Sequence, residues 1–286
     1  MAVMLMWAPP KELECRFIKS FDGIELNVCS NVWGKRVEGR VAVLLHGSPG
    51  QVSNWRYQID YLVGKGYPVV VYDQRGYGKS GKPVEVSMDD YLKDLSTVLK
   101  ALSVEDGQAV LVGHSFGTMV ALVYAVDREV PALCLIGSVV RLKTDITDWF
   151  IRHLPPAIWR KLFFTENFLT RRMYRKLFFS KETPDEVYEE FIRDNKEYLE
   201  SLPPHTFKYL YRFLDYDARK YAPKVKAKTV IIVGDEDAVT PPDESRKLHE
   251  LMPESKLLIV KGAGHMILYE KPHVINEEVE ALLKYG

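Results

Sequence analysis

The stretch from residue 109 to residue 124 constrains the fold more than any other part of the chain. A run of apolar residues, 110–112, stops at Gly-His-Ser-Phe-Gly (113–117), and small and apolar residues at helical spacing follow at once. This is G-x-S-x-G between a strand and a helix, a turn so tight that Gly113 and Gly117 must lack a Cβ. The pattern predicts that Ser115 stands at the bend as a nucleophile; a structural turn in a glycine-rich loop is the alternative.

Strand and helix patterns alternate along most of the chain. Residues 13–20 and 24–29 alternate apolar and polar positions around Asp22-Gly23, which predicts an antiparallel hairpin. Residues 40–46 form a continuous apolar run, which is typical of a strand covered on both faces. Further strands are expected at 69–72, 110–114, 132–137, 229–233 and 256–260. Helices are expected at 54–65, after the Ser87 cap, and at 243–251 and 272–284. The alternation predicts an α/β fold with a doubly wound, mostly parallel sheet.

The pattern changes between residues 140 and 223. Strand signals disappear, and helical segments follow one another, broken by prolines. This stretch carries 18 of the 33 aromatic residues. We expect a helical lid at 140–223, over the carboxyl edge of a core formed by 1–139 and 224–286. Some aromatic side chains would line a pocket, and the others would form the insertion's own core. The basic residues at 171, 172, 175 and 176 are expected on a solvated helix face.

Composition narrows the function classes. The 286 residues include 39 Lys and Arg against 39 Asp and Glu, so no net charge favours nucleic acid or an anionic membrane. No apolar stretch approaches the roughly 18 residues needed to span a bilayer, and the apolar start lacks the basic region of a signal peptide. The cysteines, Cys15, Cys29 and Cys134, lie far apart, which favours free thiols in a reducing compartment. A cytoplasmic protein is therefore expected.

A serine nucleophile requires a base and an acid, which in this arrangement follow in the order Ser, Asp or Glu, His. Among seven histidines, His265 alone follows a late strand in a glycine-rich loop, and it is the predicted base. The strand at 229–233 runs into Asp235-Glu236-Asp237, where Asp237 is the predicted acid and Asp235 the reserve.

Two backbone N–H groups are predicted to form the oxyanion hole. We call the turn at Gly113–Gly117 the elbow. One N–H group belongs to Phe116, at the start of the helix after the elbow, where the helix dipole adds partial positive charge. The other belongs to Ser48, in the loop His46-Gly47-Ser48-Pro49-Gly50 after the strand at 40–46. Without the elbow, this loop would be read as an ordinary Gly/Pro turn.

Five motifs together resemble those of the α/β-hydrolase fold superfamily, in its lid-bearing branch. They lie at residues 46–50, 73–80 (Asp-Gln-Arg-Gly-Tyr-Gly-Lys-Ser), 113–117, 234–241 and 264–272. The resemblance covers residues 13–284 and implies an eight-stranded sheet. It also implies that Asp73 and Arg75 are structural, not catalytic. Epoxide hydrolases and haloalkane dehalogenases of this family carry an aspartate at the elbow, so Ser115 argues against both.

Together, the motifs and the family resemblance predict a carboxylic-ester hydrolase that works through an acyl-enzyme. An aminopeptidase or amidase like the proline iminopeptidases is the main alternative, although those members usually have H-G-G-P-G where this chain has Ser48. Perhydrolase chemistry and a ligand-binding receptor on the same scaffold also remain open. No metal or organic cofactor is expected. The expected partner is a small ester or amide with an apolar group, with no nucleic acid and no stable membrane insertion; a homodimer is left open.

Overall fold

A computed structural model describes residues 6–142, 158 and 167–285, and its centre is an eight-stranded sheet. The strand order is β1-β2-β4-β3-β5-β6-β7-β8. Strand β2 runs antiparallel to both β1 and β4, and the remaining neighbours are parallel. The strand bounds are β1 Glu14–Lys19, β2 Glu25–Ser30, β3 Val41–Leu45, β4 Val69–Tyr72, β5 Ala109–His114, β6 Ala132–Ile136, β7 Lys228–Gly234 and β8 Lys256–Val260. The predicted doubly wound α/β fold is confirmed.

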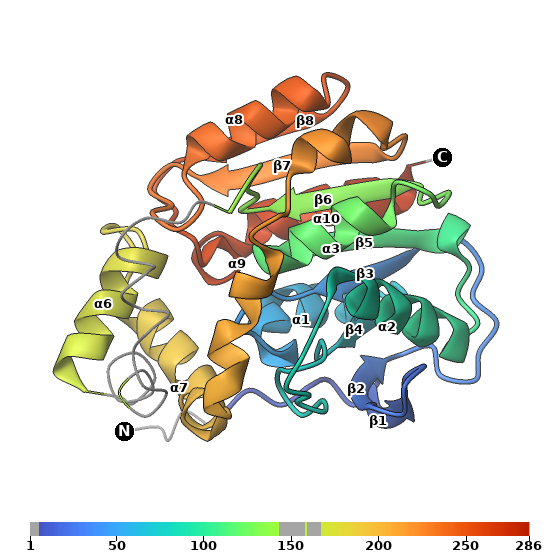
Figure 1. Ribbon diagram of the computed structural model, residues 1–286, viewed down its shortest axis with the longest axis horizontal. Helices are drawn as coiled ribbons and strands as arrows, with labels where there is room; N and C mark the ends of the chain where they lie inside the picture. Colours follow the sequence, from blue (N-terminus) through green and yellow to red (C-terminus); the bar gives the residue numbers. More distant parts are fainter. Residues whose placement is uncertain (1–5, 143–157, 159–166, 286) are drawn as a thin grey trace.

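Helices cover both faces of the sheet, which explains why its central strands are apolar throughout. All five residues of β3 are buried, and they alternate between two hydrophobic clusters, one on each face. One cluster includes side chains of α2, α3 and α8, and the other includes side chains of α1, α9 and α10. Figure 1 shows how these helices are arranged around the sheet. The bounds are α1 Arg56–Gly64, α2 Met88–Ala101, α3 Phe116–Tyr124, α8 Pro242–Leu251, α9 Ile267–Glu270 and α10 Pro272–Lys284. None of the helices within the described ranges is long and apolar enough to cross a membrane.

Local sequence signals explain two of these elements. The hairpin of β1 and β2 turns at Asp22-Gly23, where Gly23 has φ +87°, a conformation that favours glycine. Helix α2 begins with a capping box, in which the Ser87 side chain accepts a hydrogen bond from the Asp90 backbone and the Asp90 carboxylate accepts one from the Ser87 backbone. Both predictions are confirmed.

A helical insertion follows β6 and precedes β7. It contains α6 (Phe168–Phe178), α7 (Asp185–Ser201) and the 3-10 helix η3 (Pro204–Phe213), and we call these residues, 167–213, the insertion. The rings of Tyr188 and Phe191 both pack edge-on against Phe179, with centroids 5.3 Å away in each case, so part of the aromatic content forms the insertion's own core. Trp149, Phe163 and Phe164 lie outside the described residues, so the expected lid boundaries at 140 and 223 stay a prediction.

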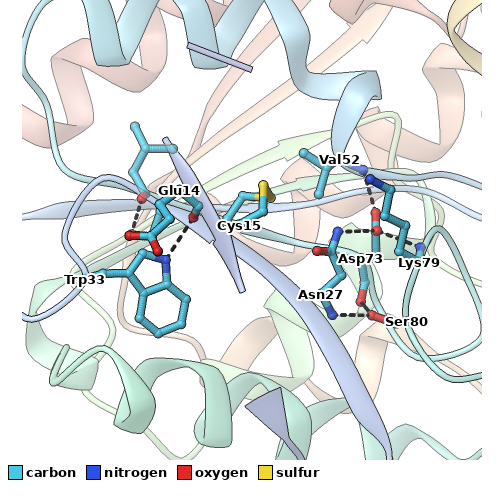
Figure 2. Close-up of a disulfide and its surroundings, with 11 residues drawn as sticks. Glu14, Cys15, Asn27, Trp33, Val52, Asp73, Lys79 and Ser80 are labelled. Atoms are coloured by element: carbon cyan, nitrogen blue, oxygen red, sulfur yellow. Dashed lines mark hydrogen bonds between the residues drawn. A yellow bond between two sulfur atoms is a disulfide. The ribbon is translucent and has the colours of Figure 1, made fainter. Parts of the chain in front are cut away.

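Two of the three cysteines form a disulfide, which corrects the expectation of free thiols. Cys15 and Cys29 are directly opposite each other in the antiparallel pair of β1 and β2, with an S–S distance of 1.99 Å (Figure 2). Cys134 is a free, buried cysteine. The two half-cystines are equidistant from Asp22, so the predicted hairpin already contained the register that pairs them. The cysteine argument for a reducing compartment therefore no longer applies.

The Asp73 carboxylate organises the turn after β4. It accepts hydrogen bonds from the Val52 backbone at 2.7 Å, the Asn27 amide at 2.8 Å and the Lys79 backbone at 2.8 Å (Figure 2). Arg75 is buried against the Asp94 carboxylate, with an N–O distance of 2.6 Å. These contacts agree with the structural role that the family resemblance implied for Asp73 and Arg75.

Candidate active site

Ser115 occupies the sharp turn between β5 and α3. Its backbone has φ +51° and ψ −117°, a conformation that side chains rarely adopt. A Cβ on Gly113 would lie 2.5 Å from the Gly117 carbonyl oxygen, and a Cβ on Gly117 would lie 2.1 Å from the Leu45 carbonyl oxygen. The two glycines are therefore required by the close approach of α3 to β5 and β3, as the motif predicted.

His265 and Asp237 meet through one short hydrogen bond. His265 Nδ1 lies 2.8 Å from Asp237 Oδ2, and both side chains are buried. Because the carboxylate can only accept, Nδ1 carries the proton and the neutral ring keeps an unprotonated Nε2. The two residues come from the loops after β8 and β7, which are parallel neighbours in the sheet, so both loops leave from the same edge.

The Asp237 carboxylate is held in place by three further donors. Its Oδ1 accepts the backbone N–H groups of Val239 at 2.9 Å and Thr240 at 2.7 Å, and its Oδ2 accepts the Thr240 hydroxyl at 2.7 Å. Burial disfavours the charged form, but the His265 ring and the hydrogen bonds of Thr240 outweigh it and hold the pKa of Asp237 below its usual value. The carboxylate is therefore ionised at neutral pH.

The two neighbouring acids point elsewhere. Asp235 Oδ1 accepts the Gly262 backbone N–H at 2.8 Å, and Glu236 Oε2 accepts the Lys181 backbone N–H at 3.1 Å. Of the three consecutive acids, Asp237 is the one that contacts the imidazole of His265. Asp235, the reserve, supports the loop that precedes His265.

His114 supports the loop that carries His265. Its Nε2 donates to the His265 carbonyl oxygen at 2.9 Å, and the two ring centroids are 4.8 Å apart. Burial, and next the neighbouring His265 ring, lowers the pKa of His114 to about 3. His114 is therefore a neutral donor at physiological pH.

The predicted oxyanion loop lies against Ser115. A Cβ on Gly47 would be 3.0 Å from the Ser115 Cβ, so this loop approaches the elbow to van der Waals distance. The Ser48 hydroxyl contacts the Tyr77 hydroxyl at 2.6 Å. Phe116 is the first residue of α3, where the helix itself does not use the backbone N–H. The loop that carries Ser48 and the first residue of α3 thus both lie beside Ser115.

A cavity of about 170 Å³ joins Ser115, His265 and the loop at 46–50. Its lining residues are Gly47, Ser48, Pro49, Gly50, Asn54, His114, Ser115, Met173, Tyr174, Leu177, Phe178, Phe191, Asn195, Leu199, His265 and Met266. The side chains from the insertion are mostly apolar, and none of the described residues that line the cavity is an aspartate, glutamate, lysine or arginine. The cavity suits an uncharged, apolar substrate group.

Sequence reasoning missed one residue, Thr240, that contacts both the predicted acid and the predicted base. The Thr240 hydroxyl donates to Asp237 Oδ2 and lies 3.2 Å from His265 Nδ1. The signal was present as Asp237-x-x-Thr240, a spacing at which an aspartate commonly accepts hydrogen bonds from the turn that follows it.

Comparisons with known proteins identify the family of this chain. The family model described as alpha/beta hydrolase fold matches residues 41–272. AB hydrolase superfamily protein YisY of Bacillus subtilis is 28% identical over 83% of this chain and 89% of its own. The proline iminopeptidase of Saccharolobus solfataricus is 26% identical over 90% of this chain and 89% of its own. Among solved structures, an esterase from Exiguobacterium antarcticum superposes with a TM-score of 0.79 at 24% identity, covering 95% of this chain and 100% of that one. The chain belongs to the alpha/beta hydrolase fold family.

Proposed function

We propose that this hydrolase cleaves carboxylic esters of uncharged, apolar compounds through an acyl-enzyme. One observation carries the proposal: Ser115, His265 and the Ser48 loop line a single cavity, and Asp237 is bonded to the imidazole behind it. A serine hydroxyl needs such a base to become a nucleophile, and the base needs a group that fixes its tautomer.

The chemistry follows from these positions. Ser115 Oγ attacks the ester carbonyl while His265 Nε2 takes its proton, and the ionised Asp237 stabilises the imidazolium that forms. The backbone N–H groups of Ser48 and Phe116 bind the developing oxyanion, and each such donor contributes roughly 3 to 4 kcal/mol. The imidazolium then protonates the leaving alcohol. A water molecule next attacks the acyl-enzyme while His265 takes its proton, and His265 returns that proton to Ser115 Oγ as the acid leaves.

The lining of the cavity favours a neutral substrate. Relatives include proteins named proline iminopeptidase. A substrate with a free N-terminal proline would bring a protonated amine into the cavity. An amine calls for a carboxylate facing the nucleophile, and the described part of the lining contains none. Met173, Leu177 and Phe178 instead present apolar surface to the cavity that His265 lines, which favours a neutral acyl or alkyl group.

A substrate panel tests the proposal. The protein is assayed with p-nitrophenyl esters of two to eight carbons and with prolyl-β-naphthylamide, beside the Ser115→Ala variant. We expect the esters to be cleaved with a burst of one p-nitrophenol per chain where deacylation is slow, and we expect a loss of at least about a thousandfold in kcat for Ser115→Ala. Faster turnover of the prolyl amide would favour the aminopeptidase. Binding of esters without turnover would favour a receptor.

A further inference from the structure

A carboxylate outside the proposed triad joins the insertion to the histidine loop. Glu270 is the last residue of α9, five positions after His265. Its Oε2 accepts the Gly264 backbone N–H at 2.7 Å, and its Oε1 accepts the Ser180 backbone N–H at 2.7 Å and the Thr183 hydroxyl. One side chain therefore satisfies a donor beside the predicted base and two donors of the insertion.

The same two segments also touch at the level of the backbone. The Met266 N–H donates to the Phe178 carbonyl oxygen at 2.8 Å. A Cβ on Gly264 would lie 2.7 Å from the Phe179 carbonyl carbon and 2.7 Å from the Ser180 nitrogen, so no side chain fits between them. The Phe178 ring centroid is 5.9 Å from that of His265. Residues 178–183 and 264–266 form one packed unit.

Two charged side chains, Arg175 and Glu270, hold the turn at 180–183. Arg175 donates to the carbonyl oxygens of Ser180, at 2.7 Å, and of Thr183. Burial raises the pKa of Glu270, although the hydrogen bonds from Thr183 and the backbone oppose this. The basic run expected on a solvated face thus includes one residue with a structural task inside the insertion.

We infer that Glu270 is a positioning residue for the base: it couples the docking of the insertion to the alignment of His265. This inference rests on the proposed function of His265. Because Glu270 binds Gly264 and Ser180 through different oxygens, displacing residues 178–183 removes packing and polar partners from the loop that carries the imidazole. The C-terminal end of α6 is accordingly a support for the base.

The test replaces Glu270 with Gln and follows the hydrolysis of p-nitrophenyl acetate. The amide keeps one acceptor oxygen and presents an NH2 group to a backbone N–H, so one of the two ties breaks. A hydrogen bond between a buried N–H and a charged acceptor corresponds to roughly a ten- to hundredfold change. We expect kcat to fall by about that factor with KM within about twofold. Acetate is too small to reach most of the insertion, so a role only in substrate contact would leave its kcat unchanged.

A second variant and a matched control keep the outcome interpretable. Gly264→Ala pushes the insertion away sterically and should reproduce the loss of kcat. Glu278→Gln makes the same chemical change on α10, where the carboxylate pairs with Lys256 at 2.6 Å, and should leave the kinetics unchanged. Thermal melting of each variant verifies folding. An unchanged kcat in Glu270→Gln, or a change confined to KM, overturns the inference.

A structural readout separates this inference from the proposed function. If the native protein cleaves no ester, the proposed function fails, and hydrogen exchange still decides whether Glu270 joins the two segments. We expect amide protection to fall together at 178–183 and 264–266 in Glu270→Gln, but not in Glu278→Gln. Unchanged protection at 264–266 in Glu270→Gln would also overturn the inference.

Discussion

At the scale of single residues, the site depends on residues that their neighbours hold in one conformation or one tautomer. Ser115 holds a backbone conformation of a kind that costs about 1–3 kcal/mol, and the strand before it and the helix after it impose that conformation. His265 has one tautomer available because Asp237 can only accept a hydrogen bond. The acid is in turn fixed by Thr240, so its carboxylate does not rotate away from the ring.

The ranking of the adjacent acids tests this account. We expect Asp237→Asn to lower kcat for p-nitrophenyl butyrate by on the order of 10³- to 10⁴-fold, because an amide NH2 facing Nδ1 selects the wrong tautomer. Asp235→Asn should cost less than about tenfold, because Asp235 contacts the Gly262 backbone and not the ring. Steady-state kinetics of both variants decide the matter, and the reverse ranking would reassign the acid.

At the scale of elements, the position of the nucleophile depends on three backbones that pass at contact distance. Helix α3 crosses over β5 and β3, and Gly117 faces the Leu45 carbonyl oxygen with no room for a methyl group. Neither strand can move aside, since each is hydrogen-bonded to two neighbours in the sheet. The elbow is thus a property of the packing of elements as much as of the five-residue motif.

Substitution of Gly117 by Ala should therefore destabilise the whole fold. We expect a loss of about 1–3 kcal/mol or more in the free energy of unfolding, as for other overpacked sites, measured by urea denaturation. The matched control is Gly64→Ala in α1, where an added Cβ meets nothing within 4 Å. That change should be neutral or stabilising by up to about 1 kcal/mol, because alanine is the better helix former. Equal stability of the two variants would contradict the packing argument.

At the scale of the whole molecule, the fold buries two histidines in their neutral form. The His46 Nε2 accepts the Gln74 backbone N–H at 2.9 Å, so this nitrogen carries no proton. Burial lowers the pKa of His46, against the opposing charge of Asp73, and burial also lowers the pKa of His114 to about 3. The unfolded chain protonates both rings below about pH 6.5, so it binds more protons than the native protein.

Stability should therefore decrease on acidification. Each buried histidine that stays neutral lowers the free energy of unfolding by about 1.4 kcal/mol per pH unit below roughly pH 6.5, and for His114 this continues to about pH 3. Urea midpoints measured at pH 7.5, 6 and 5 should fall in that order. His114→Gln should reduce the dependence on pH, whereas His273→Gln, at an exposed position, should not. Midpoints that are independent of pH would contradict this reading.

Local patterns in the sequence determined the elements and their order. Continuous apolar runs predict buried strands, and Gly113, Ser115 and Gly117 define the elbow, because these signals depend on residues within one turn or strand. The order of Ser115, Asp237 and His265 along the chain could be read in the same way, as could the hairpin around Asp22-Gly23.

Tertiary structure alone decided which groups meet. The parallel pairing of β7 with β8, with Gly234 opposite Val260, sets the loops of the acid and the base side by side, and that register brings Asp237 to the ring. The contact of Glu270 with Ser180 likewise required the insertion to dock against the loop that carries His265. Such contacts join residues far apart in the chain, so their distances follow from the packed sheet and insertion and not from local sequence.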